Sequence, residues 1–229
     1  MSIELSPRLR RIAEYVPAGG VVVDVGTDHA YIPIWLLQTG VSPRAYASDV
    51  KPGPLKNAEA DAARAGVRDR LTLFLCDGLT LCAPDAVDTV ILAGMGGETM
   101  MGILGAAPWA WEKRLILQPQ TKLPEFRRWL SERGLAIRDA TLVHDTGRLY
   151  LVWLVGRGQM RPDAVIDPVL IEKRDPLLRA YTAELIKRQR KQLHGMAQAR
   201  EKDPAALDRL RSELEELEKI YREAETWRR

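Results

Sequence analysis

The segment VVVDVGTDHAYIP, from Val21 to Pro33, decides which fold this chain is expected to adopt. Its first half is an apolar, β-branched run that ends in Asp24-Val25-Gly26, the pattern of a buried strand passing into a glycine turn. Because Gly26 has no side chain, the backbone there could approach a ligand lying across the strand ends, where open α/β sheets bind cofactors. Asp28 and His29 then stand where a dinucleotide-binding turn would carry further glycines.

The chain up to residue 156 alternates short apolar runs with helical patterns, which indicates a mostly parallel sheet flanked by helices. The expected strands share β-rich composition and cover Val21–Val25, Arg44–Ser48, Leu71–Leu75, Thr89–Ala93 and Leu115–Leu117. Two further runs, Leu135–Val143 and Leu149–Val155, are separated only by a glycine-containing turn, which predicts a terminal antiparallel hairpin. Helical periodicity fills the gaps at Pro7–Tyr15, His29–Thr39, Pro52–Ala65, Glu98–Gly105 and Lys122–Arg133. The expected fold is α/β with seven strands.

The pattern changes after the hairpin. The stretch 156–176 contains three prolines and several charges, and we expect it to be a loosely ordered connector. Two apolar stripes at three- and four-residue spacing then predict a helical hairpin, whose second helix starts at Asp203-Pro204. The basic residues of the first helix lie mostly opposite its stripe and comprise Arg179, Lys187, Arg188, Arg190, Lys191, Arg200 and Lys202. Such a face is either solvated surface or a grip for phosphates.

Composition limits the class of protein. The chain has 229 residues and a net charge of +3, and its excess of basic residues lies after Gly156. It has no long apolar run and no leader pattern, so we expect a soluble cytoplasmic protein. Cys76 and Cys82 fit neither a metal motif nor a disulfide framework, and no His, Cys or Asp cluster has metal spacing. We therefore expect no metal.

The acid in the first turn narrows the kind of cofactor. A carboxylate would repel a diphosphate, whereas S-adenosylmethionine carries no phosphate and presents an ammonium group that a carboxylate can hold. The turn therefore favours S-adenosylmethionine over a dinucleotide. At two later strand ends, Asp49 could bind ribose hydroxyls and Asp77 could accept a hydrogen bond from the adenine amino group. The alternatives are a helix cap for Asp49 and a turn residue before Gly78 for Asp77.

The fourth strand ends in AGMGG, Ala93 to Gly97. Methyltransferases that modify exocyclic amines often place an Asn or Asp and prolines at this position, but glycines supply only backbone and open space for a flat base. Asp28 is the candidate replacement, because a carboxylate could bind the amine of adenine and offset the positive charge that the ring gains on methylation at N1. The alternative is that Asp28 caps the helix expected from His29.

Together these motifs resemble the bacterial tRNA (adenine-22-N1)-methyltransferase family. The resemblance covers most of residues 5–156 and is carried, in order, by LSPRLRRIAEYV, DVGTDHAYIPIWL, SDVKPGPLKNA, DGL, ILAGMGGETM, LILQP and GRLY. It implies an α/β, Rossmann-like class I S-adenosylmethionine domain over residues 1–156, and a connector with a helical, coiled-coil-like, tRNA-binding extension over residues 157–229. The implied reaction methylates N1 of an adenine in the D arm of tRNA.

The residue pattern and the resemblance assign roles to individual positions. Asp28 is the expected catalytic residue. The expected cofactor contacts follow strand ends and are Asp24, Gly26, Thr27, Asp49, Val50, Asp77, Gly78, Ala93 and Gly94. The expected substrate contacts are His29, Tyr31, Met95, Gly96, Gly97, Arg8, Arg188 and Lys191. Arg8, Arg10 and Arg11 could extend a basic track for tRNA, or form the solvated side of an amphipathic helix.

Other functions remain compatible with parts of this pattern. The same cofactor could serve methyl transfer to another RNA base or to a small molecule, and a vestigial pocket could leave a non-catalytic RNA-binding protein. A nicotinamide oxidoreductase is disfavoured by the glycines missing after Gly26. Among these, we expect a tRNA methyltransferase that binds tRNA, no metal and no membrane, and that works as a monomer.

Overall fold

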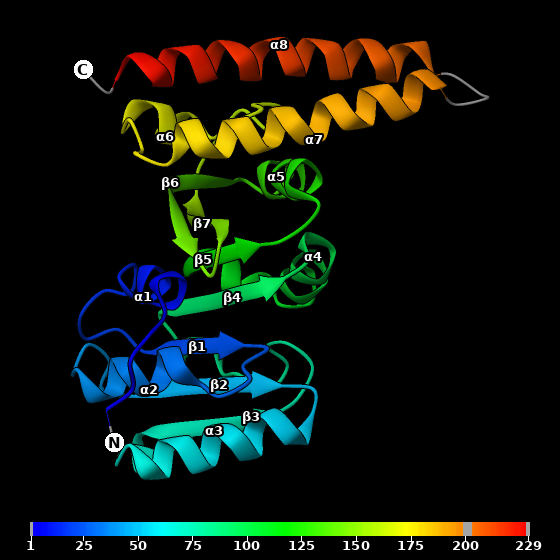
Figure 1. Ribbon diagram of the computed structural model, residues 1–229. Helices are drawn as coiled ribbons and strands as arrows, with labels where there is room; N and C mark the ends of the chain where they lie inside the picture. The colour runs from blue at the N-terminus through cyan, green and yellow to red at the C-terminus, as the bar shows by residue number, and fades with distance from the viewer. Residues whose placement is uncertain (1, 199–202, 228–229) are drawn as a thin grey trace. The chain divides into compact units, whose positions relative to one another are not determined.

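The computed structural model describes residues 2–198 and 203–227, which divide into two compact units, residues 1–162 and residues 163–229. The first unit is a seven-stranded sheet with helices (Figure 1). Its strands are β1 (Val22–Val25), β2 (Ala45–Asp49), β3 (Leu71–Leu75), β4 (Thr89–Met95), β5 (Arg114–Pro119), β6 (Leu135–Asp145) and β7 (Arg148–Arg157). Its helices are α1 (Pro7–Ala13), α2 (Tyr31–Gln38), α3 (Pro52–Arg64), α4 (Gly97–Ala106) and α5 (Leu123–Glu132).

The strand order is β3-β2-β1-β4-β5-β7-β6. The first five strands of this order run parallel, and β7 pairs antiparallel with both β5 and β6. The chain winds outward from β1 to β3 and then returns to β4 on the other side of β1. Ligands of open α/β sheets bind where the strand order reverses in this way, outside the carboxyl ends of the strands. The site is therefore expected beyond β1 and β4. The predicted α/β class and terminal hairpin are confirmed.

Helices cover both faces of the sheet, and the alternation of side chains along each strand separates the two layers. On one face, Ile12 of α1 and Ile34 of α2 join a buried cluster that includes Ile116 and Val152. On the other face, Phe126 of α5 packs against Trp153, with ring centroids 5.9 Å apart. The sheet thus lies between two layers of helices, and this packing fixes the positions of the carboxyl ends of its strands.

The second unit contains α6 (Pro168–Glu172), α7 (Leu178–Gln198) and α8 (Pro204–Thr226). Helices α7 and α8 pair antiparallel, since Arg179 contacts Glu225 near one end and Gln189 contacts Leu210 nearer the other. Asp203 caps α8 by accepting a hydrogen bond from the amide of Ala206. The predicted helical hairpin is therefore confirmed. The expectation of a loosely ordered connector is wrong, because β7 extends to Arg157 and α6 forms within that stretch.

No helix among the described residues is long and apolar enough to cross a membrane.

Candidate active site

The turn after β1 leaves backbone exposed at the carboxyl ends of the central strands of the sheet. Gly26 has a φ of +73°, a conformation that side chains disfavour, and a Cβ there would lie 2.9 Å from the Cε of Met95. The amides of Gly26 and Thr27 both donate to the carbonyl of Ser48, at 2.8 and 3.2 Å. The turn is thus fastened to β2, and Gly26 presents its backbone where a ligand would lie.

Asp24 lies buried beneath this turn, with only 7 % of its surface exposed. Burial raises the pKa of Asp24 to about 6, although a hydrogen bond with Thr27 and the positive charge of Arg8 oppose the shift. A cation bound beside Asp24 would favour its ionised form. The position therefore suits a ligand that carries an ammonium group.

Asp28 does not cap the following helix. The Oγ1 of Thr27 accepts a hydrogen bond from the amide of Ala30 at 3.0 Å, and Ala30 adopts a left-handed conformation with φ of 52°. Helix α2 then begins at Tyr31 with no side-chain cap, rather than at His29 as expected. The Asp28 side chain is 76 % exposed. The capping alternative for Asp28 is wrong, and its carboxylate faces solvent at the site.

His29 contacts a buried acid that was not among the predicted site residues. Its Nδ1 lies 2.7 Å from the Oδ2 of Asp61, a buried residue of α3, and its Nε2 lies 3.7 Å from the Oδ2 of Asp28. Tyr31 stacks on the imidazole, with ring centroids 4.9 Å apart. Burial alone would raise the pKa of Asp61, but hydrogen bonds from His29 and Arg64 hold it below its usual range.

Arg8 forms another wall of the site. Its Nη1 donates to the Oε1 of the buried Gln118 at 3.1 Å, and the amide of Gly94 donates to the same oxygen at 3.2 Å. Asp145 fixes the start of α1 by accepting a hydrogen bond from the Ser6 hydroxyl at 2.7 Å. Arg8 therefore lies beside Asp24 and Gly94 rather than on a surface track.

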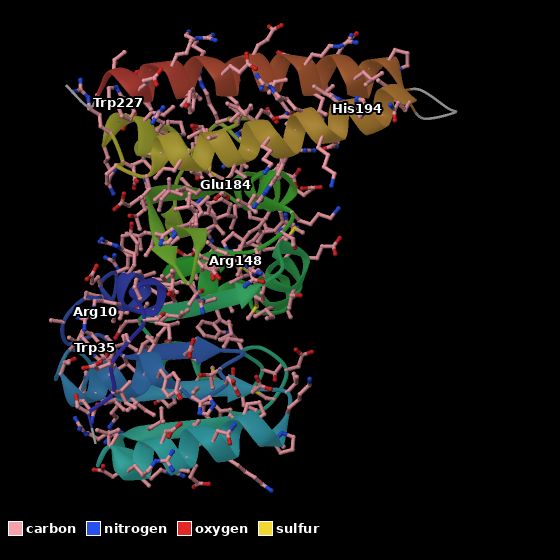
Figure 2. All side chains as sticks on the ribbon, in the orientation of Figure 1. Arg10, Trp35, Arg148, Glu184, His194 and Trp227 are labelled. Atoms are coloured by element: carbon pink, nitrogen blue, oxygen red, sulfur yellow. The ribbon has the colours of Figure 1, made fainter. Side chains whose placement is uncertain are left out.

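The other two arginines of α1 contact neighbours on the outside of the helix. Arg10 lies over the ring of Trp35, 5.4 Å from its centroid (Figure 2), and Arg11 pairs with Glu14 at 2.9 Å. Both contacts are those of a solvated amphipathic helix.

A cavity of about 370 Å³ joins these elements at the switch point of the sheet. It brings together five of the nine expected cofactor contacts, Asp24, Gly26, Thr27, Ala93 and Gly94, with the expected catalytic and substrate residues Asp28, Arg8, His29 and Tyr31. Leu9, Ala30 and Ile32 complete its lining. We call it the β1/β4 cavity.

The glycines that follow Gly94 have a packing explanation. A Cβ on Gly96 would lie 2.9 Å from the Oγ1 of Thr121, and one on Gly97 would lie 2.8 Å from the carbonyl oxygen of Thr121. Within the part of the chain that the structure describes, Met95, Gly96 and Gly97 do not line the β1/β4 cavity. These glycines let α4 start against the β5–α5 loop, whereas the sequence reading took them to open space for a base.

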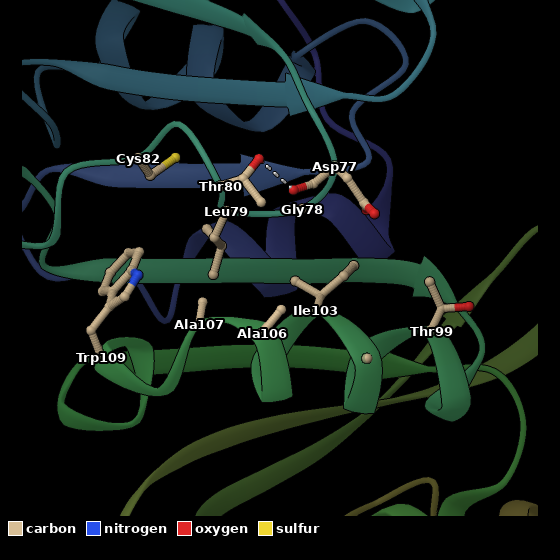
Figure 3. Close-up of a pocket in the computed structure, with 11 residues that line it drawn as sticks. Asp77, Gly78, Leu79, Thr80, Cys82, Thr99, Ile103, Ala106, Ala107 and Trp109 are labelled. Carbon is tan, nitrogen blue, oxygen red and sulfur yellow. Dashed lines mark hydrogen bonds between the residues drawn. The ribbon is translucent and has the colours of Figure 1, made fainter.

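A second cavity, of about 510 Å³, lies between the loop after β3 and helix α4 (Figure 3). Asp77 and Thr99 lie toward one end of it and Trp109 and Cys82 toward the other. Gly78 has a φ of +57°, and a Cβ there would lie 3.0 Å from a methyl carbon of Ile103. Asp77 and Gly78 therefore form one wall of a space adjacent to the sheet edge.

The far end of this second cavity, where Cys82 and Trp109 lie, does not have the properties of a reactive site. Cys82 is a free cysteine, and burial raises its thiol pKa to about 11. It is therefore a poor nucleophile. Trp109 also lines this cavity.

Asp49 is the last residue of β2, which lies between β1 and β3, and Val50 follows it. The Oδ1 of Asp49 accepts a hydrogen bond from the amide of Lys51 at 2.7 Å, and Lys51, not Asp49, is the N-cap position of α3. Val50 is 60 % exposed, which is unusual for a large apolar side chain. Among the residues that the structure describes, neither of these two lines the β1/β4 cavity or the second cavity, so their expected contacts with the cofactor stay a prediction.

The basic face of α7 is partly neutralised by its neighbours. Arg190 pairs with Glu218 at 2.7 Å, and Arg179 pairs with Glu225 at 2.9 Å. Both acids belong to α8. Arg188 lies 3.6 Å from Glu184, and Lys191 is exposed. The predicted Arg200 and Lys202 lie outside the described residues.

No group of three or more His, Cys, Asp or Glu side chains that could hold a metal ion occurs in residues 2–198 and 203–227.

The fold and the β1/β4 cavity are those of a Rossmann-like methyltransferase, and comparison with known proteins agrees. A family model described as a methyltransferase domain matches residues 5–153. The tRNA (adenine(22)-N(1))-methyltransferase of Bacillus subtilis is 30% identical over 197 residues, which cover 80% of this chain and 82% of that protein. The chain belongs to the tRNA (adenine(22)-N(1))-methyltransferase family.

Solved structures show the same likeness. The crystal structure of the B. subtilis m1A22 tRNA methyltransferase TrmK superposes with a TM-score of 0.84 at 26% identity, covering 96% of this chain and 100% of that one. A putative tRNA (m1A22) methyltransferase of Streptococcus pneumoniae, in complex with S-adenosyl-L-methionine, has a TM-score of 0.82 at 27% identity and covers 95% and 100% of the two chains.

Proposed function

We propose that this protein transfers a methyl group from S-adenosylmethionine to N1 of adenine 22 in the D arm of tRNA. The observation that carries the proposal is the β1/β4 cavity, in which a buried acid, a bare glycine turn and an exposed carboxylate meet at the switch point of a methyltransferase fold. The 30% identity with a tRNA (adenine(22)-N(1))-methyltransferase supports the choice of substrate.

The residues at the sheet edge fit S-adenosylmethionine. When bound, this cofactor supplies an electrophilic methyl group on a sulfonium sulfur. Gly26 offers a backbone free of side chain, and the buried Asp24 offers a carboxylate for the ammonium group of the methionyl end. We propose that Asp49 and Val50, at and after the end of β2, contact the ribose, and that Asp77 and Gly78, after the end of β3, contact the adenine.

Asp28 is placed to act on the target base. The N1 atom of adenine has a free lone pair, so its attack on the methyl carbon requires no base, and the positive charge passes from sulfur to the adenine ring. A carboxylate held near the ring stabilises that charge as it develops. Asp28 is exposed at the mouth of the cavity, where it could also accept a hydrogen bond from the exocyclic amine. His29 and Tyr31 form the adjoining wall.

The β4 side of the cavity completes this arrangement. Ala93 and Gly94 line it, and the amide of Gly94 is fixed by the buried Gln118. Gly94 is exposed, and the nearest atom to a Cβ there would be 3.8 Å away. A flat base could therefore approach the backbone at this position, as proposed for the AGMGG motif.

The terminal helices are proposed to grip the tRNA backbone. Arg188 and Lys191 lie one turn apart on α7 and are exposed, a placement that suits phosphate contacts, which supply affinity without reading sequence. Residues 1–156 would then carry the chemistry, and residues 157–229 the connector and the tRNA-binding part. We propose that the protein works as a monomer in the cytoplasm.

The test is methyl transfer to paired transcripts. Purified protein is incubated with labelled S-adenosylmethionine and a tRNA transcript with adenine at position 22, alongside the same transcript with guanine there, and the modified base is mapped. The proposal predicts 1-methyladenosine at position 22 in the first transcript and no label in the second. Equal labelling of both transcripts, or of neither, would overturn it.

A further inference from the structure

We propose that Asp61 is a positioning residue of the active site, which fixes the imidazole of His29 so that its Nε2 atom faces Asp28 and the β1/β4 cavity. The inference rests on the proposed function and adds to it a residue that lies outside the strand-end motifs. Asp61 lies in the last turn of α3, 32 positions beyond His29 in the sequence. No strand-end pattern would have pointed to it.

The hydrogen bond between the two residues sets which nitrogen faces the cavity. Asp61 is 4 % exposed, and the hydrogen bonds from His29 and Arg64 keep the pKa of its carboxyl below the usual range despite its burial. An ionised carboxylate can only accept hydrogen bonds. The Nδ1 of His29, 2.7 Å from Oδ2, must therefore carry a hydrogen toward Asp61. The Nε2 atom is left on the side of Asp28, 3.7 Å from its Oδ2.

Fixing the ring also fixes the apolar surface beside it. Tyr31 stacks on His29 with an angle of 14° between the rings, and 37 % of Tyr31 is exposed. His29, Tyr31 and Asp28 all line the cavity. A base that enters it would meet a preoriented imidazole, an aromatic face and a carboxylate, so rotation of the His29 ring would disturb all three contacts.

Arg64 separates the positioning role from a merely structural one. Its guanidinium contacts the other carboxylate oxygen of Asp61, one turn along α3, and its side chain is 60 % exposed. Loss of this pair removes an exposed partner of Asp61, while the hydrogen bond from His29, the largest single contact that lowers the pKa of the Asp61 carboxyl, stays in place. Arg64→Ala is therefore the matched control for substitutions of Asp61.

Asp61→Asn is the test substitution because it keeps the size of the side chain. If the amide oxygen keeps its contact with Arg64, the NH₂ group faces the Nδ1 of His29 and donates where the carboxylate accepted. The hydrogen of His29 would then move to Nε2, or the ring would turn. We expect kcat for methyl transfer to fall by roughly tenfold to a hundredfold, as for other misplacements of about 1 Å at a reacting site. The dissociation constant of Asp61→Asn for S-adenosylmethionine should stay within about twofold of the wild-type value. The kcat of the control, Arg64→Ala, should also stay within about twofold of the wild type.

A double-mutant cycle and a spectroscopic measurement show whether the effect passes through His29. In a His29→Gln background, Asp61→Asn should cost little further activity, because the group that it positions is already gone. The chain has three histidines, and His144 and His194 are exposed, so nitrogen-15 NMR of the imidazoles offers two internal references. In the wild type, His29 should show a protonated Nδ1, and Asp61→Asn should shift that signal.

The outcomes are distinguishable. An active wild type with Asp61→Asn within about twofold of its kcat, or an equal loss in the His29→Gln background, would overturn this inference alone. An unprotonated Nδ1 in the wild type would do the same, even if Asp61→Asn did not fold. A folded wild type that methylates no tRNA would overturn the proposed function together with this inference.

Discussion

The β1/β4 cavity and the α7–α8 pair both carry many charges, but they hold them in opposite ways. Asp24 lines the cavity and Asp61 contacts His29 of its wall; both acids are buried and accept hydrogen bonds from neighbouring residues. On α7, the Arg188 side chain is 75 % exposed and that of Arg190 is 64 % exposed, although both have acidic partners. Exposed ion pairs contribute little energy and are screened by salt, whereas buried groups keep strong, short-range interactions.

The two regions are therefore expected to differ in what they contribute: the cavity to catalysis, and the exposed bases of α7 to tRNA binding. A buried, hydrogen-bonded charge depends on one geometry, and the exposed Asp28 is proposed to act directly on the reacting base, so a single substitution of either kind at the cavity should remove most of its function. Exposed bases on a helix act nearly independently, so each should contribute a small and salt-dependent share of affinity. Substitutions at the cavity should therefore cost the most, a substitution in the packing of α4 less, and loss of the exposed bases of α7 the least.

Asp28→Ala should reduce kcat for tRNA methylation by roughly a hundredfold to a thousandfold, the usual cost of losing one group that stabilises developing charge. Because Asp28 is exposed and caps no helix, the free energy of unfolding and the affinity for S-adenosylmethionine should stay close to those of the wild type. Steady-state kinetics, calorimetric titration and thermal unfolding measure the three quantities. An equal loss of cofactor binding would make Asp28 a cofactor ligand.

Asp24→Asn should weaken S-adenosylmethionine binding by roughly tenfold to a hundredfold. The ammonium group of the cofactor would then face a neutral amide in place of an ionised carboxylate. Calorimetric titration measures the affinity, and Asp88→Asn, an acid near the opposite ends of the strands, is the control. Unchanged affinity in Asp24→Asn would show that the ammonium group of the cofactor is held elsewhere.

The raised pKa of Asp24, about 6, predicts a pH dependence with a definite sign. Below pH 6 the free protein holds Asp24 protonated, so S-adenosylmethionine affinity should decline as the pH falls from 7 to 5, and Asp24→Asn should flatten that decline. For folding the sign is opposite, because the folded-state pKa lies above the ordinary value of 3.8. The contribution of Asp24 to stability should therefore fall as the pH rises from about 4 to 6. A pH-independent affinity would contradict this assignment.

Gly97→Ala should lower the free energy of unfolding by about 1–3 kcal/mol, because its Cβ would meet the backbone of Thr121 at 2.8 Å. Gly102→Ala, in the same helix, has nothing within 4 Å and should instead stabilise the protein by about 0.5–1 kcal/mol. Denaturant unfolding compares the two. Equal effects would mean that the loop after β5 yields to the new methyl group.

Arg188→Ala combined with Lys191→Ala should weaken tRNA binding several-fold and reduce the slope of log affinity against log salt concentration by about 1–2. The matched control removes the same charge at the same spacing from α8, with Lys219→Ala and Arg222→Ala, both of which are exposed. Binding is measured by filter retention at several salt concentrations. A similar loss in the control pair would assign the effect to net charge rather than to the α7 face.

Much of the fold could be predicted from the sequence because its signals are local. The valines of β1, the glycine turn after Asp24 and the short turn between β6 and β7 each indicate their structure within a few residues. Helix α6 was missed although Asp167-Pro168 is the same kind of helix start that located α8. The prolines around it were read as markers of disorder, and that outweighed the cap signal.

The site was harder to predict, because its missing parts come from distant segments. Arg8 was expected to contact the substrate along a basic track or to lie on the solvated side of its helix, and its contact with Gln118, 110 positions away, instead holds it at the cavity wall. Asp61 did leave a signal. It falls on the face of α3 that also buries Leu55 and Ala58, and a carboxylate on a buried helix face requires a partner. The partner, His29, could be identified only once the strands were in register.

The comparison between the two regions is tested most directly by single-turnover methylation at saturating tRNA and S-adenosylmethionine. Binding is then complete, so only losses in the chemical step remain visible. We predict that the Arg188→Ala and Lys191→Ala double variant regains the wild-type rate constant under these conditions, while Asp28→Ala remains slower by roughly a hundredfold or more. A full recovery of Asp28→Ala at saturation, or a persistent loss in the double variant, would contradict the assignment of chemistry to the β1/β4 cavity and of grip to α7.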